Sequence, residues 1–323
     1  ALKTIFDQVY DQTYIQELFS LATEFYLQDK RNDPSQRWPI ISPICPVVNR
    51  LIYYRFPALL PHLLPFLAPR EISARELRKK LLERSSFRPE EIGVYHITPC
   101  SAKMLSIKSP LFLNKSHLDG VIGINEVFTK TRSSLGHISD EVIYHYSSGV
   151  GIGWAKSGGE ISAIDGARTL AVSGIKETIT YLEKIELGLL NGIEYLEFRA
   201  CHEGCIGGQL TAVDKYEAKR TTDRLVRMFG IEKRVRPQYV RKLYESGFFT
   251  AERELATLVN PGNVDIIRAI NRAKEVQSLW ELLPQKECGA CGSPDCMTFA
   301  EDVIDGLQTP DRCFFLREMR SWN

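Results

Sequence analysis

Residues 199–208, with the sequence RACHEGCIGG, constrain this chain more than any other stretch. Cys201 and Cys205 are four residues apart, so a single turn can bring both thiolates to one side. Gly207 and Gly208 follow at once, and glycines let the backbone pass close to a bulky group. Small iron–sulfur clusters bound by thiolates need both features. The segment therefore predicts a site for such a cluster.

The composition excludes several classes of protein. The chain has 323 residues, of which 44% are apolar and 25% are charged, as in ordinary globular proteins. Its formal net charge of +1 argues against a nucleic acid or a membrane surface as partner. The longest apolar stretch, residues 56–67, holds three prolines and is too short to span a membrane. The N-terminus has no signal-peptide pattern, so we expect a cytoplasmic protein.

The eight cysteines fall into two groups of four along the chain. Disulfides are rare in the cytoplasm, and the C-x2-C spacing near the C-terminus is typical of metal ligands. We therefore expect each group to hold one cluster. The first group is Cys45, Cys100, Cys201 and Cys205, and the second is Cys288, Cys291, Cys296 and Cys313.

Three predicted strands, residues 38–42, 93–98 and 193–198, each end close to a cysteine of the first group. Ligands collect at the carboxyl ends of strands in open α/β sheets, so we expect these cysteine segments to meet. A local zinc finger would not draw its ligands from segments so far apart in the sequence. Taken alone, Cys45 is better explained as a buried, inert cysteine.

Helical periodicity predicts helices between and after these strands, at residues 47–55, 73–83, 173–192, 213–229, 237–245 and 264–283. The second of these helices should open with a capping box that starts at Ser73. The glycine-rich residues 148–160 lack the order of a nucleotide-binding loop, so we interpret them as a loop that packs against the central site. The chain changes character after Leu283, which predicts domains 1–283 and 284–323.

The second cysteine group has the spacing C-x2-C-x4-C-x16-C. Four thiolates with this spacing fit a [4Fe–4S] cluster or a tetrahedral zinc ion. Zinc sites usually contain two C-x2-C pairs, and this group has one, which favours iron–sulfur by roughly two to one. Disulfides are the third and weakest interpretation.

The three segments of the first group, SPICP at 42–46, TPCSAK at 98–103 and ACHEGCIGG at 200–208, resemble the signature segments of the [FeFe]-hydrogenase catalytic domain, in the same order. The tail is similar to the small four-cysteine domain that follows this domain in hydrogen-sensing members. Residues 153–160 and 197–201 also look more like the sensory branch than like the fast enzymes. The resemblance covers roughly residues 37 to 323. It implies a two-lobed α/β domain with parallel sheets flanked by helices, followed by a small α-rich iron–sulfur domain.

The resemblance also implies a cofactor, the H-cluster. In the family, four cysteines hold a [4Fe–4S] cubane, here matched by Cys45, Cys100, Cys201 and Cys205. Cys205 would also bridge to a two-iron subsite that carries CO, cyanide and a dithiolate. Lys103 matches the family lysine that binds a cyanide, a charge-assisted contact. Cys205 and Lys103 are thus the expected catalytic residues, and the tail would hold one additional [4Fe–4S] cluster.

Three positions depart from the family pattern. Ile44 stands where fast members have a cysteine that relays protons, so we expect low turnover. Arg199 stands where a methionine is frequent; we assign it to cofactor binding, because a fixed positive charge should raise the potential of the cluster. Ser106 replaces a common glutamate, and no cysteine for a ferredoxin-like cluster precedes Cys45. We interpret the histidines, His96 among them, as structural.

The function that the resemblance implies is that of a hydrogen-sensing or slow hydrogenase, with H2 and protons as its reactants and electrons passing to the tail cluster. Its other partners would be a redox protein or ferredoxin-like domain, and a downstream signalling domain or other subunits of a complex. The alternative is an iron–sulfur protein without the two-iron subsite, for electron transfer or as a scaffold. Lys103 and the glycine loop favour a retained subsite, whereas Ile44, Arg199 and Ser106 favour its loss. Structural zinc with inert cysteines has about one chance in twenty, given the false positives of motifs.

Overall fold

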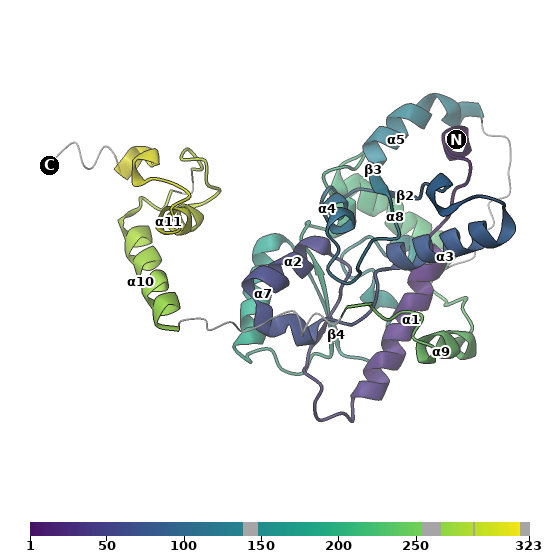
Figure 1. The fold of residues 1–323 in the computed structure, drawn as a ribbon, viewed down its shortest axis with the longest axis horizontal. Coiled ribbons are helices and arrows are strands. Elements are labelled where there is room, and N and C mark those ends of the chain that lie inside the picture. The colour runs from purple at the N-terminus through teal and green to yellow at the C-terminus, as the bar shows by residue number, and fades with distance from the viewer. Residues whose placement is uncertain (138–147, 254–265, 287, 317–323) are drawn as a thin grey trace. The chain divides into compact units, whose positions relative to one another are not determined.

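The computed structural model describes residues 1–137, 148–253, 266–286 and 288–316. The chain folds into two compact units, Ala1–Val259 and Asn260–Asn323. The first unit holds all the strands that the structure describes, in two small parallel sheets flanked by helices. The predicted α/β class is therefore confirmed (Figure 1).

The first sheet has the strand order β1-β5-β4, with β1 at Ile40–Ile41, β4 at Thr169–Ser173 and β5 at Tyr195–Arg199. Both neighbours of the central strand β5 run parallel to it. β1 and β5 correspond to predicted strands. β4 was not predicted, because its five residues stand next to a long helical pattern with only one fully buried side chain among them.

Side chains alternate along β5, so its two faces reach different cores. Leu196 and Phe198 pack in a cluster with α2 (Pro46–Arg55), the 3-10 turn at Pro57–His62 and α7 (Ile175–Glu186). Tyr195 belongs to the opposite cluster, with α1 (Thr13–Lys30) and α9 (Pro237–Glu245). Figure 1 shows α2 and α7 on one side of this sheet and α1 on the other. The same alternation directs Glu197 and Arg199 toward the face that Tyr195 occupies.

The second sheet pairs β2 (Tyr95–Thr98) with β3 (Gly120–Gly123) in parallel. Its helices are α3 (Pro69–Arg84), α4 (Ala102–Lys108) and α5 (Ile124–Thr131), and a small core around Val94 and Ile107 joins it to α3. The predicted capping box at Ser73 is wrong. Helix α3 already begins at Pro69, whose fixed φ suits the first helical position, and Ser73 is buried inside the helix.

The rest of the first unit surrounds these sheets. Helix α8 (Lys215–Phe229) begins at Asp214, whose carboxylate accepts the backbone N–H groups of Tyr216 and Glu217. The short helix α6 (Gly149–Gly153) packs against α8 and leads into Trp154, whose ring meets that of Phe19 edge to face at 5.8 Å. Other 3-10 turns lie at Leu2–Thr4, Pro89–Glu91, Arg132–His137, Ile161–Ala163 and Cys205–Gly207.

The second unit is small and helical, with α10 (Ile266–Leu282), α11 (Cys296–Ile304) and a 3-10 turn at Pro310–Arg312. Its core includes Val276 of α10 together with Phe299 of α11, and Arg272 forms an ion pair with Asp305 at 2.6 Å. By packing, α10 thus belongs to this second compact unit, while the sequence changes character after Leu283.

Among the described residues, no helix is both long enough and apolar enough to cross a membrane.

The packing of the first sheet generates a stability prediction. Leu196 is fully buried between α2 and α7, so Leu196→Ala should lower the free energy of unfolding by about 2–5 kcal/mol through lost burial and an unfilled cavity. Urea unfolding followed by circular dichroism measures the change. Leu187→Ala is the control, because Leu187 is 70% exposed at the end of α7 and its loss should cost about 0.5 kcal/mol or less. Equal effects of the two substitutions would contradict this packing.

Candidate functional site

Each cysteine of the first group stands just beyond the carboxyl end of a strand or in the loop that follows it. Cys45 follows β1 and is the N-cap of α2, and Cys100 lies between β2 and α4. Cys201 follows β5 directly, and Cys205 opens the 3-10 turn Cys205–Gly207. The strands belong to two sheets, however, and not to one. The site therefore lies where the carboxyl ends of two sheets meet.

Backbone contacts join the two sheets at this place. The N–H of Leu210 donates to the Pro99 carbonyl at 3.0 Å, and the Leu210 carbonyl accepts the N–H of Asn125 at 3.0 Å. The Ser101 hydroxyl also donates to Gln209 Oε1 at 3.1 Å. The segment that leaves β5 through Cys201 and Cys205 is thus fastened to the Cys100 loop of the other sheet.

The structure brings the four thiols within electrostatic reach of one another. Burial, together with the charges of Cys205, Cys45 and Cys100, raises the pKa of Cys201 to about 11. Burial also raises the pKa of Cys45, and the charge of Cys205 adds to this rise. The backbone N–H of Ala200 lowers the same pKa, because it favours the thiolate. Thiolates that lie close together are stabilised by a positively charged centre such as a bound metal.

Glycines make the close approach at this site possible. Gly204 has a φ of +85°, and a Cβ there would lie 2.5 Å from the backbone nitrogen of Ser157. A Cβ on Gly208 would lie 2.3 Å from the Pro99 carbonyl oxygen. The N–H of Ser157 also donates to the Glu203 carbonyl at 3.0 Å. The glycine-rich loop therefore packs against the cysteine loop, as its sequence predicted.

The Lys103 ammonium is enclosed in the first turn of α4. Its Nζ donates to Thr98 Oγ1 at 3.0 Å and lies 3.3 Å from His96 Nε2. Burial lowers the pKa of Lys103, and the Cys205 thiolate opposes that shift. Burial and the Lys103 charge hold the pKa of His96 well below its usual range, so His96 is neutral and can accept from the ammonium. His96 was expected to be structural, and nothing in its sequence context pointed to Lys103.

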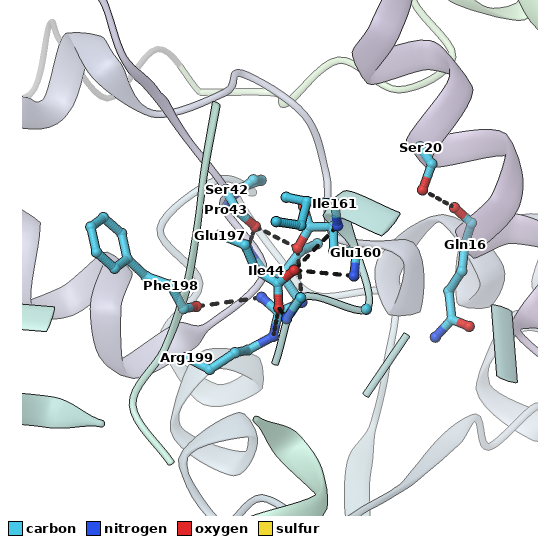
Figure 2. Close-up of polar contacts among 12 residues, drawn as sticks. Gln16, Ser20, Ser42, Pro43, Ile44, Glu160, Ile161, Glu197, Phe198 and Arg199 are labelled. Carbon is cyan, nitrogen blue, oxygen red and sulfur yellow. Dashed lines mark hydrogen bonds and ion pairs between the residues drawn. The ribbon is translucent and has the colours of Figure 1, made fainter. Parts of the chain in front are cut away.

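Arg199 is 1% exposed and is surrounded by carboxylates (Figure 2). Its Nη2 donates to Glu160 Oε2 at 2.8 Å, and its Nε lies 3.5 Å from Glu197 Oε1. Glu160 also accepts from Ser42 Oγ at 2.9 Å and from the Tyr195 hydroxyl at 2.5 Å. Because Arg199 is ion-paired, the carboxylates offset much of the positive charge that the sequence places two residues before Cys201.

Glu197 ties the glycine-rich loop to β5. Its carboxylate accepts three backbone N–H groups, from Gly158 at 3.1 Å, Glu160 at 3.1 Å and Ile161 at 3.2 Å. Burial raises the pKa of Glu197 to about 7; the Arg199 charge opposes this rise and Glu160 adds to it. Sequence reasoning missed Glu160 and Glu197 as parts of the site. The alternation of Glu197 and Arg199 on one strand face was the available signal.

Two departures from the family pattern have defined surroundings. Ile44 is 6% exposed and packs in the larger apolar core, and its N–H donates to Ser42 Oγ at 3.3 Å. Ser106 donates its hydroxyl to the Lys103 carbonyl at 2.8 Å, within α4. The position before Cys45 is therefore enclosed by apolar side chains.

An anionic cluster fits these residues. Among the described residues, Lys103 forms no ion pair with a carboxylate. A buried ammonium is costly in free energy unless an anion accompanies it. Four thiolates around an iron–sulfur core supply that anion. Among the residues that the structure describes, no three His, Cys, Asp or Glu side chains are arranged around one metal ion.

Comparison with known families agrees with this chemistry. The model of the "Iron only hydrogenase large subunit, C-terminal domain" matches residues 1–167, more than half of the 323-residue chain. The chain belongs to the iron-only hydrogenase family. A model of an Fe-S cluster domain matches residues 283–315. Both matches imply iron–sulfur clusters.

Solved structures of iron-only hydrogenases share the fold. Two variants of [FeFe]-hydrogenase HydA1 from Chlamydomonas reinhardtii match with TM-scores of 0.57 and 0.59 at 14% and 15% identity, covering 77% of this chain and 85% of theirs. An apo variant of the same enzyme matches with a TM-score of 0.57 at 14% identity, covering 77% of this chain and 84% of its own. At these identities the similarity concerns the fold.

The tail cysteines of this hydrogenase-family chain also converge. Cys288, Cys291, Cys296 and Cys313 all line one pocket, together with Leu283 and Phe299 among others. Asp295 caps α11 by accepting the N–H of Thr298 at 2.7 Å, which places Cys296 at the first helical position. Gly289 and Gly292, with φ of +65° and +95°, allow the turns between the first cysteines.

The raised pKa of Glu197 predicts a pH dependence of stability. The folded-state pKa of about 7 lies above the ordinary value of 4.5, so the folded chain holds a proton that the unfolded chain releases. The contribution of Glu197 to the free energy of unfolding is therefore fully present below pH 4.5. It is lost as the pH rises toward 7, a change on the order of a few kcal/mol.

Glu197→Gln should remove this dependence, as urea unfolding at a series of pH values between 4.5 and 8 would reveal. Glu177→Gln is the matched control, because Glu177 is exposed on α7. If wild type and Glu197→Gln respond to pH in parallel, Glu197 is already ionised in the folded protein.

Proposed function

We propose that this chain is a hydrogen-sensing or slow [FeFe]-hydrogenase-like protein, with the overall reaction H2 = 2 H+ + 2 e−. The observation that carries the proposal is the meeting of three cysteine segments from two sheets beside a buried lysine that has no carboxylate partner among the described residues. The family membership agrees with it.

The residues have distinct roles in this proposal. Cys45, Cys100, Cys201 and Cys205 would hold a [4Fe–4S] cubane, and Cys205 would also bridge to a two-iron subsite with CO, cyanide and dithiolate ligands. When bound, that subsite supplies the chemistry of H2 splitting. The chain itself supplies four thiolates, a close-packed glycine loop and a fixed cation.

In this proposal Lys103 binds an anionic ligand of the two-iron subsite and orients it. Thr98 Oγ1 and His96 Nε2 take up two of the three hydrogens of its ammonium, which leaves one for an anionic ligand such as cyanide. A charge-assisted hydrogen bond in a buried place is strong and directional. The contacts to Thr98 and His96 therefore preorganise the third donor.

Ile44 accounts for slow turnover. Its side chain can neither accept nor donate a proton, and it is buried among apolar residues that exclude water. Proton transfer by a positioned side chain typically contributes 10²- to 10⁴-fold to a rate. Without that transfer the site is better suited to registering H2 than to consuming it quickly.

Electrons would pass to a second [4Fe–4S] cluster on Cys288, Cys291, Cys296 and Cys313. From there a redox partner protein, a ferredoxin-like domain or a downstream signalling domain would receive them. The second candidate function is an iron–sulfur electron carrier or scaffold without the two-iron subsite. The apolar enclosure of Ile44 favours this candidate, because it removes the proton path that catalysis uses.

Infrared spectroscopy separates these two functions. We expect the anaerobically matured protein to show bands of iron-bound CO and cyanide, and Lys103→Met to shift the cyanide bands because it removes the donor. Lys108→Met, at the far end of α4, is the control that should leave the bands in place. A matured wild type with full iron content but without these bands would support the carrier instead.

Restoring a proton carrier at position 44 should raise turnover. Ile44→Cys is expected to increase H2 evolution from a reduced dye by about tenfold or more, since a thiol can relay protons. Ile44→Ala is the control, because it removes comparable bulk without adding a titratable group. An equal increase in both variants would mean that access, rather than proton transfer, limits the rate.

A further inference from the structure

A cavity lies beside the cysteine site, where the N-terminal ends of α2 and α3 meet α4. It is lined by Pro43 and Pro46, which flank Cys45, by Arg70 of α3 and by Ser106 of α4. Asn49, also in the lining, has a buried Oδ1 without a hydrogen-bond partner. The cavity thus borders the segment of Cys45 and the helix that carries Lys103.

Arg70 is a buried, charged side chain that has no role in the proposed H2 chemistry. Its side chain is 10% exposed, and its buried Nε has no hydrogen-bond partner. Nη2 donates to Ser106 Oγ at a long 3.3 Å. The carboxylate of Glu71 is 3.9 Å from Nε, and it already accepts from Ser116 Oγ at 2.9 Å and from the His117 N–H at 3.0 Å.

The cysteines are the other charges near Arg70. Burial lowers the pKa of Arg70; Glu71 opposes this most, followed by Cys100, Cys45 and Cys205. The charge of Arg70 also lowers the pKa of Lys103, and the charges of Cys100 and Cys205 act on both cations. Arg199 differs from both, because Glu160 pairs with it at 2.8 Å.

Two buried cations with weak or no carboxylate partners leave a positive excess at this place. Such an excess is costly unless an anion enters. Neutral thiols do not provide the anion, whereas four thiolates around a cluster do. A guanidinium also offers its donors in a fixed fork, which suits an anionic ligand approached from one side.

We propose that Arg70 is a second cation of the central site, which acts with Lys103 to bind and stabilise the anionic iron–sulfur cluster held by the first four cysteines. The geometric grounds are its buried Nε, which makes no hydrogen bond, and its place in a cavity that Pro43 and Pro46, on either side of Cys45, also line. The inference rests on the proposed function only in taking the bound group to be an iron–sulfur cluster. Arg70 stabilises the reduced cluster more than the oxidised one, because reduction adds negative charge.

The test uses the full chain reconstituted with iron and sulfide, without the two-iron group. Arg70→Gln, Arg70→Lys and the control Arg84→Gln are compared; Arg84 is exposed at the end of the same helix. Redox titration followed by electron paramagnetic resonance gives the potential of each cluster. The transition of the tail cluster serves as an internal control within every sample.

Arg70→Gln should make reduction of the central cluster about tenfold less favourable, which corresponds to about 59 mV for one electron. Arg70→Lys should keep most of the wild-type potential, and Arg84→Gln all of it. Loss of the central cluster from Arg70→Gln but not from Arg70→Lys would support the same role. An unchanged potential in Arg70→Gln, or loss of the cluster from both Arg70 variants, would overturn it.

Urea unfolding of the apoprotein tests whether Arg70 only stabilises the fold. Without the cluster, Arg70 is a buried cation in excess, so apo Arg70→Gln should unfold at the same urea concentration as the wild type or a higher one. If apo Arg70→Gln is less stable or does not fold, the contacts to Ser106 and Glu71 explain the residue and the proposal fails. Absence of CO and cyanide bands would end the hydrogenase proposal, yet would leave this comparison intact.

Discussion

The site depends most on the contacts of one buried carboxylate, that of Glu160. It accepts from Ser42, which precedes Cys45 by three residues, and from Arg199, which precedes Cys201 by two. A buried guanidinium needs such a partner, so strands β1 and β5 and the glycine-rich loop are held in one arrangement. Glu197 adds three backbone contacts to the same loop. One buried carboxylate thus connects the segments that carry Cys45 and Cys201.

Much of this arrangement could be predicted from local pattern. Cysteines at the ends of apolar strands, the helices at 213–229 and 237–245 and the packing of the glycine-rich loop all follow from short-range sequence. The division of the strands between two sheets could not be predicted, because pairing partners are set by tertiary contacts. Strand β4 was missed because it adjoins a long helical pattern and has one buried side chain among its five residues. The false capping box at Ser73 shows a local motif overridden by an earlier helix start at Pro69.

The charge balance of the site was the hardest property to predict from the sequence. Arg199 suggested a free positive charge when only its neighbours in sequence were visible. The carboxylates that balance it come from Glu197 on the same strand and from Glu160 on a distant loop. Conversely, Arg70 stands in an ordinary helical context, and its lack of a strong partner becomes visible only once α2, α3 and α4 are assembled. Charge balance is a property of the folded site rather than of any single motif.

The two-sheet origin of the cysteines has a consequence for assembly. Cys100 follows a strand of one sheet, while Cys45, Cys201 and Cys205 follow strands of the other. A cubane that binds all four would therefore crosslink the two sheets, and it could bind in full only where both cysteine segments are already in place. Insertion of the cluster would then follow, rather than direct, the folding of the polypeptide around it.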